Sequence, residues 1–219
     1  MSGLAVRWDD VSHAYGAADV VSGVSLAIEA GESVALLGHN GAGKTTLTRM
    51  LMGLVRPRTG RVTVGDWDVA ARRPDEMARR VGYAFQHADQ QLFARSVRED
   101  VAFGPHQLGQ GDGGVDDVLA EPDLTGAAAR HPYDLPAPVR KLVTLAGVLA
   151  MRPGVLVFDE PTAGFDAGLR RLVVQAVQRR SAAGVTVLCV SHDLAFVAAV
   201  ARRSVTIARG RVVEVSPSP

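Results

Sequence analysis

Two kinds of apolar segment follow one another along the chain. One is a short continuous run of strand length, and the other is a longer segment in which apolar residues recur every three to four positions. Four short runs are apolar almost throughout, which is typical of strands buried on both faces: residues 34–37, 81–85, 155–158 and 185–190. Helices are expected after residue 43 and at residues 75–80, 169–181 and 194–200. Because strands that alternate with helices form mainly parallel sheets, the pattern predicts an α/β fold with ligands at the carboxyl edge of the sheet.

Both ends of the chain carry additional β-structure. Gly23 interrupts the second of three strands expected near the N-terminus, at residues 4–8, 20–28 and 61–64. A hairpin is expected at the C-terminus, at residues 205–208 and 211–215. The fold is therefore predicted to combine a mainly parallel sheet with an N-terminal antiparallel β part.

The pattern changes in the middle of the chain. Apolar residues with helical spacing are separated there by stretches that contain Gly and Pro, at residues 97–103, 115–119 and 139–150. We therefore expect a helical subdomain at residues 87–151, inserted into a core of residues 1–86 and 152–219. The whole chain of 219 residues is expected to form a single domain.

The composition fits this fold and argues against a nucleic-acid partner. Hydrophobic residues make up 47% of the chain and aromatic residues only 5%. The formal net charge is +1, and no basic block is long enough to form a nucleic-acid surface. Cys189 lies within an apolar run and is expected to be a small buried hydrophobe, which suits a reducing cytoplasm. The arginine pairs are interpreted as solvated: residues 72–73, 79–80 and 202–203.

The sequence predicts neither a membrane span nor a signal peptide. The longest apolar segments, residues 143–151 and 194–201, are much shorter than the roughly 20 residues that a transmembrane helix needs. Any membrane association is therefore expected to be peripheral, on the cytoplasmic face.

Residues 38–46 read GHNGAGKTT and lie between an expected strand and an expected helix. They match the phosphate-binding pattern G-x-x-x-x-G-K-[ST] at Gly38, Gly43, Lys44 and Thr45. Glycines let backbone N–H groups of such a loop point inward, and the following helix adds its positive N-terminal end. Lys44 is expected to reach the β- and γ-phosphates of a nucleotide, and Thr45 to bind the Mg2+ that bridges them. The alternative is a chance glycine-rich turn, which the flanking strand and helix argue against.

Polar residues follow two further buried strands. Asp159 and Glu160 come after the run 155–158; Asp159 can order the shell of Mg2+, and Glu160 can accept a proton from an attacking water. His192 follows the run 185–190 and is expected at the same sheet edge, near the γ-phosphate. An isolated strand end or a lone histidine is usually structural, but polar groups that converge with a phosphate-binding loop favour an active site.

Taken in order, the motifs closely resemble those of the nucleotide-binding subunits of ABC transporters: GHNGAGKTT, Gln86 after a strand, FDEPTAGFD and SHD. The resemblance covers nearly the whole chain and implies ATP and Mg2+ as ligands. It assigns Tyr15 to stacking on adenine, and Gln86 to binding Mg2+ and sensing the membrane subunit. It likewise assigns Asp166 to the D-loop and His192 to the switch position. For Tyr15, ordinary strand packing is the alternative. The implied nucleotide-binding residues are Tyr15, Gly38, Asn40, Gly41, Gly43, Lys44, Thr45 and Thr46.

Residues 86–105 read QHADQQLFARSVREDVAFGP and indicate one subfamily of ABC ATPases. They are similar to the segment that ATPases of energy-coupling-factor importers for cobalt, nickel or vitamins carry where a transmembrane subunit docks. Ala88 replaces a proline that is usual there. The resemblance implies that exposed Leu92 or Phe93 contacts a helix of that subunit, whereas the alternative places both in the core.

One segment departs from the family pattern. ABC ATPases carry an LSGGQ signature that caps the γ-phosphate bound to the partner in a head-to-tail dimer, whereas residues 135–139 read LPAPV. Pro136 and Pro138 lack a backbone N–H, and the serine, both glycines and the glutamine are absent. We therefore expect an asymmetric dimer in which a different ATPase with an intact signature completes this chain's site. The alternative is a working variant with Pro138 in the first turn of the helix.

The resulting prediction is an ATPase subunit that binds Mg-ATP between two subunits and drives an importer of the energy-coupling-factor type. A regulatory subunit that binds ATP but hydrolyses it poorly is one alternative. A P-loop small-molecule kinase is another, although it would not be expected to carry DEPTAGFD and SHD. An ABC protein acting on DNA or ribosomes would usually need a long insertion, a second cassette or a basic face.

Overall fold

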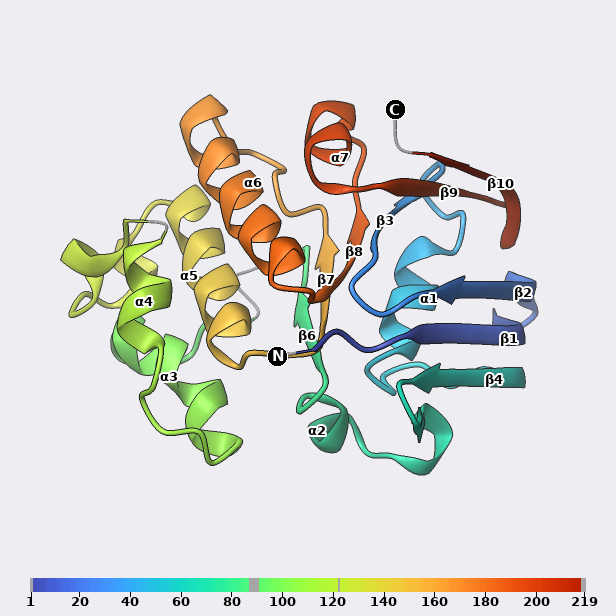
Figure 1. Ribbon diagram of the computed structural model, residues 1–219, viewed down its shortest axis with the longest axis horizontal. Helices are drawn as coiled ribbons and strands as arrows, with labels where there is room; N and C mark the ends of the chain where they lie inside the picture. Colours follow the sequence, from blue (N-terminus) through green and yellow to red (C-terminus); the bar gives the residue numbers. More distant parts are fainter. Residues whose placement is uncertain (1, 87–90, 122, 218–219) are drawn as a thin grey trace.

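The computed structural model describes residues 2–86, 91–121 and 123–217, and its larger sheet lies at the centre of the molecule (Figure 1). Its strands are β3 Ser33–Leu37, β6 Val81–Ala84, β7 Val155–Asp159, β8 Thr186–Val190, β9 Arg203–Ala208 and β10 Arg211–Pro217. The spatial order is β10-β9-β3-β8-β7-β6. All neighbours in this sheet are parallel except β10, which runs antiparallel to β9. The predicted mainly parallel sheet and C-terminal hairpin are thus confirmed.

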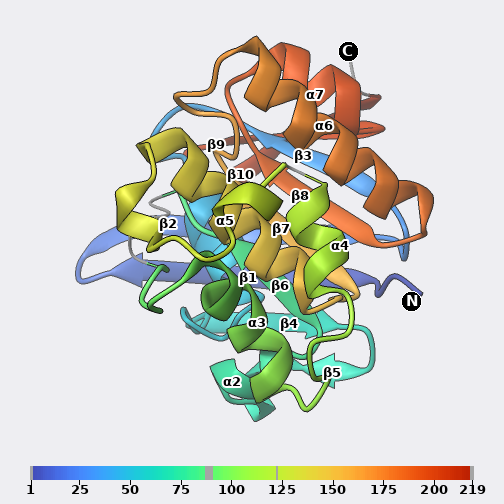
Figure 2. The ribbon, with the colours of Figure 1, turned by 90° about the vertical axis from the view of Figure 1, so that its left-hand side faces the viewer.

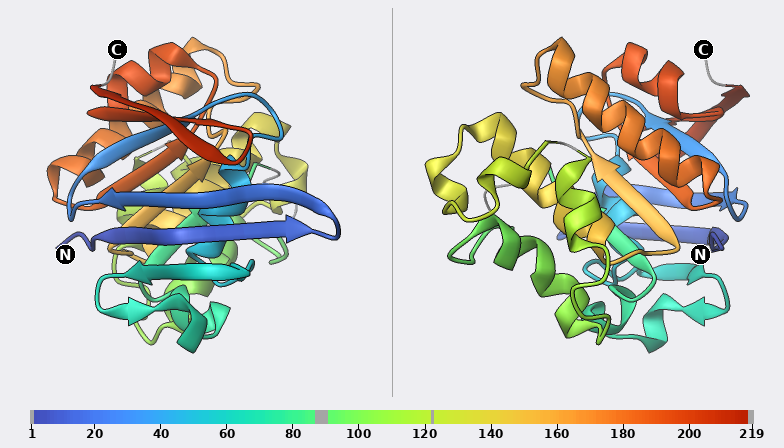
Figure 3. Two further views of the ribbon diagram at one scale, coloured as in Figure 1. Left: turned by 90° about the vertical axis from the view of Figure 1, so that its right-hand side faces the viewer. Right: turned by 60° about the vertical axis from the view of Figure 1, so that its left-hand side comes forward.

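A smaller antiparallel sheet forms the N-terminal part (Figure 3, left). Its strands are β1 Val6–Tyr15, β2 Ala18–Ile28, β4 Thr59–Val64 and β5 Trp67–Asp68, in the order β2-β1-β4-β5. The interruption expected at Gly23 is present as an irregularity in the strand pairing, although β2 continues through it. Gly23 has a φ of 61° within an irregular stretch of the β1–β2 pairing, and its N–H bonds Ser12 Oγ at 2.9 Å. The strand bends there without ending.

The buried strands of the larger sheet contribute side chains to two separate hydrophobic cores, one on each face. Val155 and Val157 face a core shared with the smaller sheet, whereas Leu156 and Phe158 face a core shared with helices. The apolar run 155–158 is therefore apolar on both faces because each face meets a different layer. The helices that flank the sheets are α1 Lys44–Met50, α2 Pro74–Met77, α6 Ala167–Ala182 and α7 Leu194–Val200.

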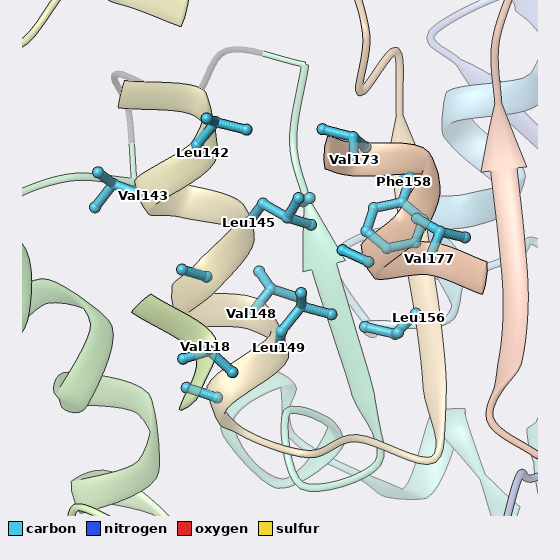
Figure 4. Packing of buried hydrophobic residues seen from close by; sticks show 14 of the residues in the cluster. Val118, Leu142, Val143, Leu145, Val148, Leu149, Leu156, Phe158, Val173 and Val177 are labelled. Atoms are coloured by element: carbon cyan, nitrogen blue, oxygen red, sulfur yellow. The ribbon is translucent and has the colours of Figure 1, made fainter. Parts of the chain in front are cut away.

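Three helices from the middle of the chain pack together on one side of the molecule (Figure 2). They are α3 Val97–Gln107, α4 Val115–Ala120 and α5 Ala137–Ala150. Leu145 and Leu149 of α5 point toward β6 and β7 and meet Phe158 and Val177 in the helical core (Figure 4). The predicted helices are present, while the division at residues 87–151 stays a prediction. Among the described helices, none is long and apolar enough to cross a membrane.

Two of the predicted solvated arginines lie instead in partly buried contacts. Arg80 donates to the Val64 carbonyl at 3.0 Å, and its guanidinium stacks over Trp67 at 3.8 Å. Arg203 binds both carboxylate oxygens of Glu32, at 2.6 and 2.9 Å. The prediction was wrong for these residues because their partners lie far away in the sequence and only the sheets bring them close.

Candidate active site

Four neighbouring parallel strands end at one edge of the larger sheet, in the order β3-β8-β7-β6. The glycine-rich loop, residues 38–43, follows β3, and His192 follows β8. Asp159 ends β7, Glu160 follows it directly, and Gln86 follows β6. Every one of these adjacent strand ends therefore carries a segment that the sequence singled out.

Glycines at the turning points allow the loop between β3 and α1 to close. Gly38 and Gly43 have φ values of 137° and 105°, which residues with a side chain rarely adopt. A Cβ atom at Gly43 would lie 2.6 Å from the Val20 carbonyl oxygen, and one at Gly38 would clash with the Ile207 carbonyl oxygen. A Cβ atom at Gly41 would meet no described atom within 4 Å. The ends of the loop are thus packed against backbone, while its tip is accessible.

Lys44 begins α1 and folds its side chain back over the loop. Its Nζ donates hydrogen bonds to the carbonyl oxygens of Gly38 and His39, at 2.6 and 2.9 Å. Burial lowers the pKa of the Lys44 ammonium, and the carboxylates of Glu160 and Asp159 act in the opposite direction. The amino group therefore lies at the base of the loop, where phosphate oxygens would be stronger acceptors than the two carbonyls.

Thr45 and Asp159 bring a hydroxyl and a carboxylate together beside Lys44. Thr45 Oγ1 donates a hydrogen bond to Asp159 Oδ2 at 3.0 Å. Asp159 is the last residue of β7 and is only 4% exposed. Such oxygens are the ligands that Mg2+ prefers, usually a small number from protein combined with phosphate oxygens. This pair fits Mg2+ bound with a nucleotide.

Glu160 is held beside His192 in a left-handed backbone conformation. Its φ is 51°, and its N–H donates to the Val190 carbonyl at 2.8 Å. Glu160 Oε2 accepts the backbone N–H of His192 at 3.4 Å, and Oε1 lies 3.5 Å from His192 Nε2. The same Nε2 lies 3.1 Å from Asn40 Oδ1. His192 thereby connects the glycine-rich loop with Glu160.

These groups line a cavity of about 450 Å³. The predicted site residues in its described lining are Asn40, Gly41, Gly43, Lys44, Thr45, Thr46, Gln86, Asp159, Glu160 and His192. Gly38 and Tyr15 lie outside this lining. Tyr15 ends β1, is 52% exposed and packs edge-on against His13 with ring centroids 4.8 Å apart. Because it is this exposed, Tyr15 is not part of the buried core. Its stacking on adenine stays a prediction.

Comparison with known proteins identifies the family. A family model described as ABC transporter matches residues 21–163. This chain belongs to the ABC transporter family. It is 40% identical to the cobalt import ATP-binding protein CbiO of Rhodobacter capsulatus, over 90% of this chain and 73% of that protein. It is 39% identical to the energy-coupling factor transporter ATP-binding protein EcfA2 of Symbiobacterium thermophilum, over 95% and 77%.

Solved structures of ABC proteins share this fold. The structure of cbiO1 from Clostridium perfringens, described as part of the ABC transporter complex cbiONQ, has a TM-score of 0.85 and 28% identity, over 97% of this chain and 88% of that one. A dimeric ATP-binding cassette bound to ADP and Pi has a TM-score of 0.86 at 22% identity, over 98% and 99%. A longer relative, a putative ABC transporter ATP-binding protein of Methanosarcina acetivorans, is matched over 34% of its length at 36% identity.

Family membership confirms several expectations from the sequence. The chain is an ABC-type ATPase with a P-loop NTPase fold, and its ligands are ATP and Mg2+. Its relatives named CbiO and EcfA confirm the resemblance to the energy-coupling-factor type. A small-molecule kinase is therefore excluded.

Sequence reasoning singled out no role for Tyr83, whose hydroxyl lies beside Asp159. Tyr83 lies on β6 and is 3% exposed. Its hydroxyl is 2.8 Å from Thr48 Oγ1 and 3.3 Å from Asp159 Oδ2. A tyrosine inside a buried strand needs a hydrogen-bond partner for its hydroxyl, so the sequence already indicated that Tyr83 contacts a buried polar group. Which partner it finds depends on the neighbouring strand and helix.

The segment expected at the ABC signature position, residues 135–139, forms a regular helix start. Pro136 is the N-cap residue of α5 and has no side-chain hydrogen bond to the helix, and Pro138 lies in the first turn. The N–H groups of Val139 and Arg140 both bond the Pro136 carbonyl, at 2.9 and 3.1 Å. The local fold is therefore intact. Even so, it offers fewer backbone donors than a Ser-Gly-Gly-Gln start, because Pro138 has no N–H and that of Val139 is already used.

The segment that resembles energy-coupling-factor ATPases forms one wall of a groove. Leu92 is buried at 6% exposure, whereas Phe93 is 62% exposed, so the expectation of an exposed side chain holds for Phe93 alone. Phe93 packs edge-on against Phe103, with ring centroids 4.6 Å apart. Ala88 lies outside the described residues. The groove measures about 140 Å³, and its lining includes Phe93, Asp100, Phe103, Gly104, Gly147 and Met151.

Proposed function

We propose that this ATPase drives a membrane importer of the energy-coupling-factor type for a metal ion or vitamin, and that it does so from the cytoplasmic face of the membrane. The observation that carries the proposal is the aromatic groove of Phe93 and Phe103, which lies on the segment that follows Gln86. Relatives at about 40% identity are named for cobalt import and for an energy-coupling factor transporter. An exposed aromatic groove is suited to an amphipathic partner helix.

In the proposed mechanism, the glycine-rich loop and Lys44 hold the triphosphate. Lys44 exchanges its two carbonyl acceptors for phosphate oxygens, which are charged and bind it more strongly. Thr45, Asp159 and Gln86 would hold Mg2+, which would supply positive charge to offset the negative charge of the phosphates. Tyr15 stacks on the adenine ring.

Glu160 acts as the general base. Its carboxylate accepts a proton from the water whose oxygen bonds the γ-phosphorus. The bond between the γ-phosphorus and the β–γ bridging oxygen breaks, and ADP is the leaving group. His192 contacts both carboxylate oxygens of Glu160 and also Asn40, so it orients the base relative to the loop that holds the phosphates. Removing the Glu160 carboxylate should therefore block hydrolysis while ATP still binds.

The proposed dimer is asymmetric. A different ATPase with an intact signature completes the site of this chain, while Pro136 and Pro138 weaken the site that this chain completes in its partner. The support is the loss of hydrogen-bond donors at the start of α5. By analogy with oxyanion holes, each lost donor costs about 2.7–4 kcal/mol of transition-state stabilisation.

The proposed docking site connects to Gln86 through Gln91. The side chain of Gln91 accepts the Phe85 N–H at 3.1 Å and donates to the Tyr83 carbonyl at 3.2 Å. Phe85 lies directly before Gln86, and Tyr83 lies three residues before it. Gln91 is followed by the groove residues Leu92 and Phe93. A transmembrane subunit seated in the groove would therefore shift the segment that carries Gln86. In this proposal, residues 87–151 form the helical subdomain, which bears both the groove and the signature position.

The asymmetric dimer is tested by light scattering on purified Glu160→Gln with and without Mg-ATP. Blocked hydrolysis traps a closed dimer if one can form. We expect Glu160→Gln to bind ATP while its molecular mass stays that of one chain. A complex of about twice that mass should form only when a partner ATPase with an LSGGQ signature is added. The double variant Lys44→Ala/Glu160→Gln is the matched control and should bind no ATP.

A doubled mass without a partner would contradict the asymmetric dimer and make the Pro-Ala-Pro segment a working signature. A second candidate, a regulatory subunit with weak turnover, is favoured by the same segment. It would be supported if the wild-type chain, paired with a full ATPase, binds ATP but the Glu160→Gln substitution leaves the turnover of the pair unchanged.

A further inference from the structure

We propose that Tyr83 is a positioning residue for the ATPase reaction, whose hydroxyl holds the Asp159 carboxylate in the orientation that binds Mg2+. This inference rests on the role proposed above for Asp159. Tyr83 is no part of the described cavity lining, so it acts through Asp159 rather than on the nucleotide.

The fold places the Tyr83 hydroxyl between the helix that follows the glycine-rich loop and the end of β7. Tyr83 pairs with Val157, two residues before Asp159, on the adjacent parallel strand. Its ring packs against Phe85 with centroids 4.4 Å apart, and its hydroxyl approaches Thr48 of α1 and Asp159. One side chain therefore bridges three elements that must keep their spacing for the site to work.

The hydrogens available to this group favour donation toward Asp159. Tyr83 and Thr48 each have one hydroxyl hydrogen, and a carboxylate only accepts. If Thr48 donates to the Thr45 carbonyl, 3.1 Å away, Tyr83 has two choices. It donates to Thr48, and Asp159 loses one donor, or it donates to Asp159 and leaves the 2.8 Å contact with Thr48 without a hydrogen. If Thr48 donates to Tyr83, then Tyr83 donates to Asp159. This last arrangement places a hydrogen in the 2.8 Å contact and ends on a charged acceptor, so it is the strongest one.

Asp159 needs this donor because it is a buried carboxylate. At 4% exposure it has little access to water, and an ionised group in such a place must be paired or hydrogen-bonded. The Tyr83 hydroxyl, 3.3 Å from Asp159 Oδ2, is one of the two hydroxyl groups within hydrogen-bonding distance of this carboxylate. Thr45 shares its hydroxyl with the proposed metal, whereas Tyr83 lies behind the carboxylate and is not displaced.

The test uses the full chain with the conservative substitution Tyr83→Phe, which removes only the hydroxyl. Binding of Mn2+, as a substitute for Mg2+, is followed by electron paramagnetic resonance in protein saturated with a non-hydrolysable ATP analogue. We expect the half-saturating Mn2+ concentration to rise about tenfold, which corresponds to ~1.4 kcal/mol. Affinity for the analogue in EDTA should stay within twofold of wild type, since the phosphate-binding loop is unchanged.

Tyr133→Phe is the matched control. It removes the same group from a tyrosine whose hydroxyl donates to the Leu92 carbonyl at 3.2 Å, away from the cavity, and should leave Mn2+ binding unchanged. Thr48→Val should raise the half-saturating Mn2+ concentration less than Tyr83→Phe does, because the Tyr83 hydroxyl can still donate its hydrogen bond to Asp159.

A Mn2+ half-saturation for Tyr83→Phe within twofold of wild type, or an equal shift in Tyr133→Phe, would overturn the proposal. A larger shift for Thr48→Val than for Tyr83→Phe would assign the positioning to Thr48 instead. Asp159→Asn separates the two levels of inference: if that variant binds Mn2+ like wild type, the role of Asp159 fails and not merely that of Tyr83.

Discussion

Each buried charge of the active site has a nearby partner. Lys44 is bonded to two carbonyls, Asp159 accepts two hydroxyl hydrogens, and Glu160 contacts His192. Unpaired charges in such places would cost several kcal/mol, so these contacts stabilise the charged groups before charged ligands bind. The left-handed backbone at Glu160 fits this interpretation, because strained conformations concentrate at functional sites.

Cys189 offers a residue-scale test of how tightly the sheet is packed. It lies on β8 beside Phe158 and is fully buried, and burial, with a smaller effect of Glu160, raises the pKa of its thiol to about 12. We expect a thiol-reactive disulfide reagent at pH 8 to modify the protein only after unfolding, since the thiolate is the reactive form. Because Cys189 is the only cysteine, absorbance of the released thiol measures it directly. Complete modification of the native protein within seconds would contradict the packing.

Helix α5 contributes to three parts of the molecule: the helical core, the predicted signature segment and the groove. Its buried face, which includes Leu145 and Leu149, anchors the helical core. Its first turn holds the signature position, and Gly147 near its end lines the groove of Phe93. A change in the position of α5 would therefore affect both the proposed dimer interface and the proposed docking site.

Replacing residues 136–139 by Ser-Gly-Gly-Gln should raise the ATPase rate of the assembled complex at least tenfold. The replacement restores backbone and side-chain donors for the γ-phosphate bound to the partner. The rate is measured with the partner ATPase present. An unchanged rate would mean that this segment does not limit turnover.

The single substitution Pro136→Ser separates stability from activity in the same segment. A serine hydroxyl at the N-cap should increase the free energy of unfolding by about 0.5–2 kcal/mol, because Pro136 supplies no side-chain cap. Pro136→Ala, which removes the ring without adding a hydroxyl, is the control. Denaturant unfolding of both variants measures the difference.

In the whole molecule, the nucleotide cavity and the groove are joined by a short stretch of chain around β6. Tyr83 contacts the cavity residue Asp159, and Gln91 bonds the backbone of Tyr83 and Phe85. Phe93 then lines the groove. In the proposed importer, these hydrogen bonds and the backbone from Gln91 to Phe93 would couple the nucleotide cavity to the groove.

Phe93→Ser should weaken association with the transmembrane subunit and leave ATP binding intact. The side chain is 62% exposed, so its loss removes apolar surface for a partner without opening a cavity in the core. The amount of transmembrane subunit that co-purifies, together with the ATP dissociation constant, gives the result. Leu54→Ser, at a leucine that is 49% exposed and lies outside the groove, is the control. Equal losses for both variants would contradict docking at the groove.

The sequence by itself determined the elements and the chemistry that depend on local spacing. The strand that ends at Asp159 follows from a short, continuous apolar run, which is typical of a strand buried on both faces. The helix at residues 194–200 was predicted in the same way, from the local sequence alone. The glycine-rich loop is likewise local, since only glycine tolerates the φ of Gly43 and the close approach to Val20. The two-residue strand β5 is too short to show a period and was not predicted.

Only the tertiary structure decided which strands and side chains are neighbours. It inserts β8 between β3 and β7, and so places His192 between Asn40 and Glu160. It also buries Leu92 while exposing Phe93, and brings Tyr83 to Asp159. Spacing along the chain specifies the face on which a residue lies but not what covers that face, because the partners are far apart in sequence and are selected by packing of the whole molecule.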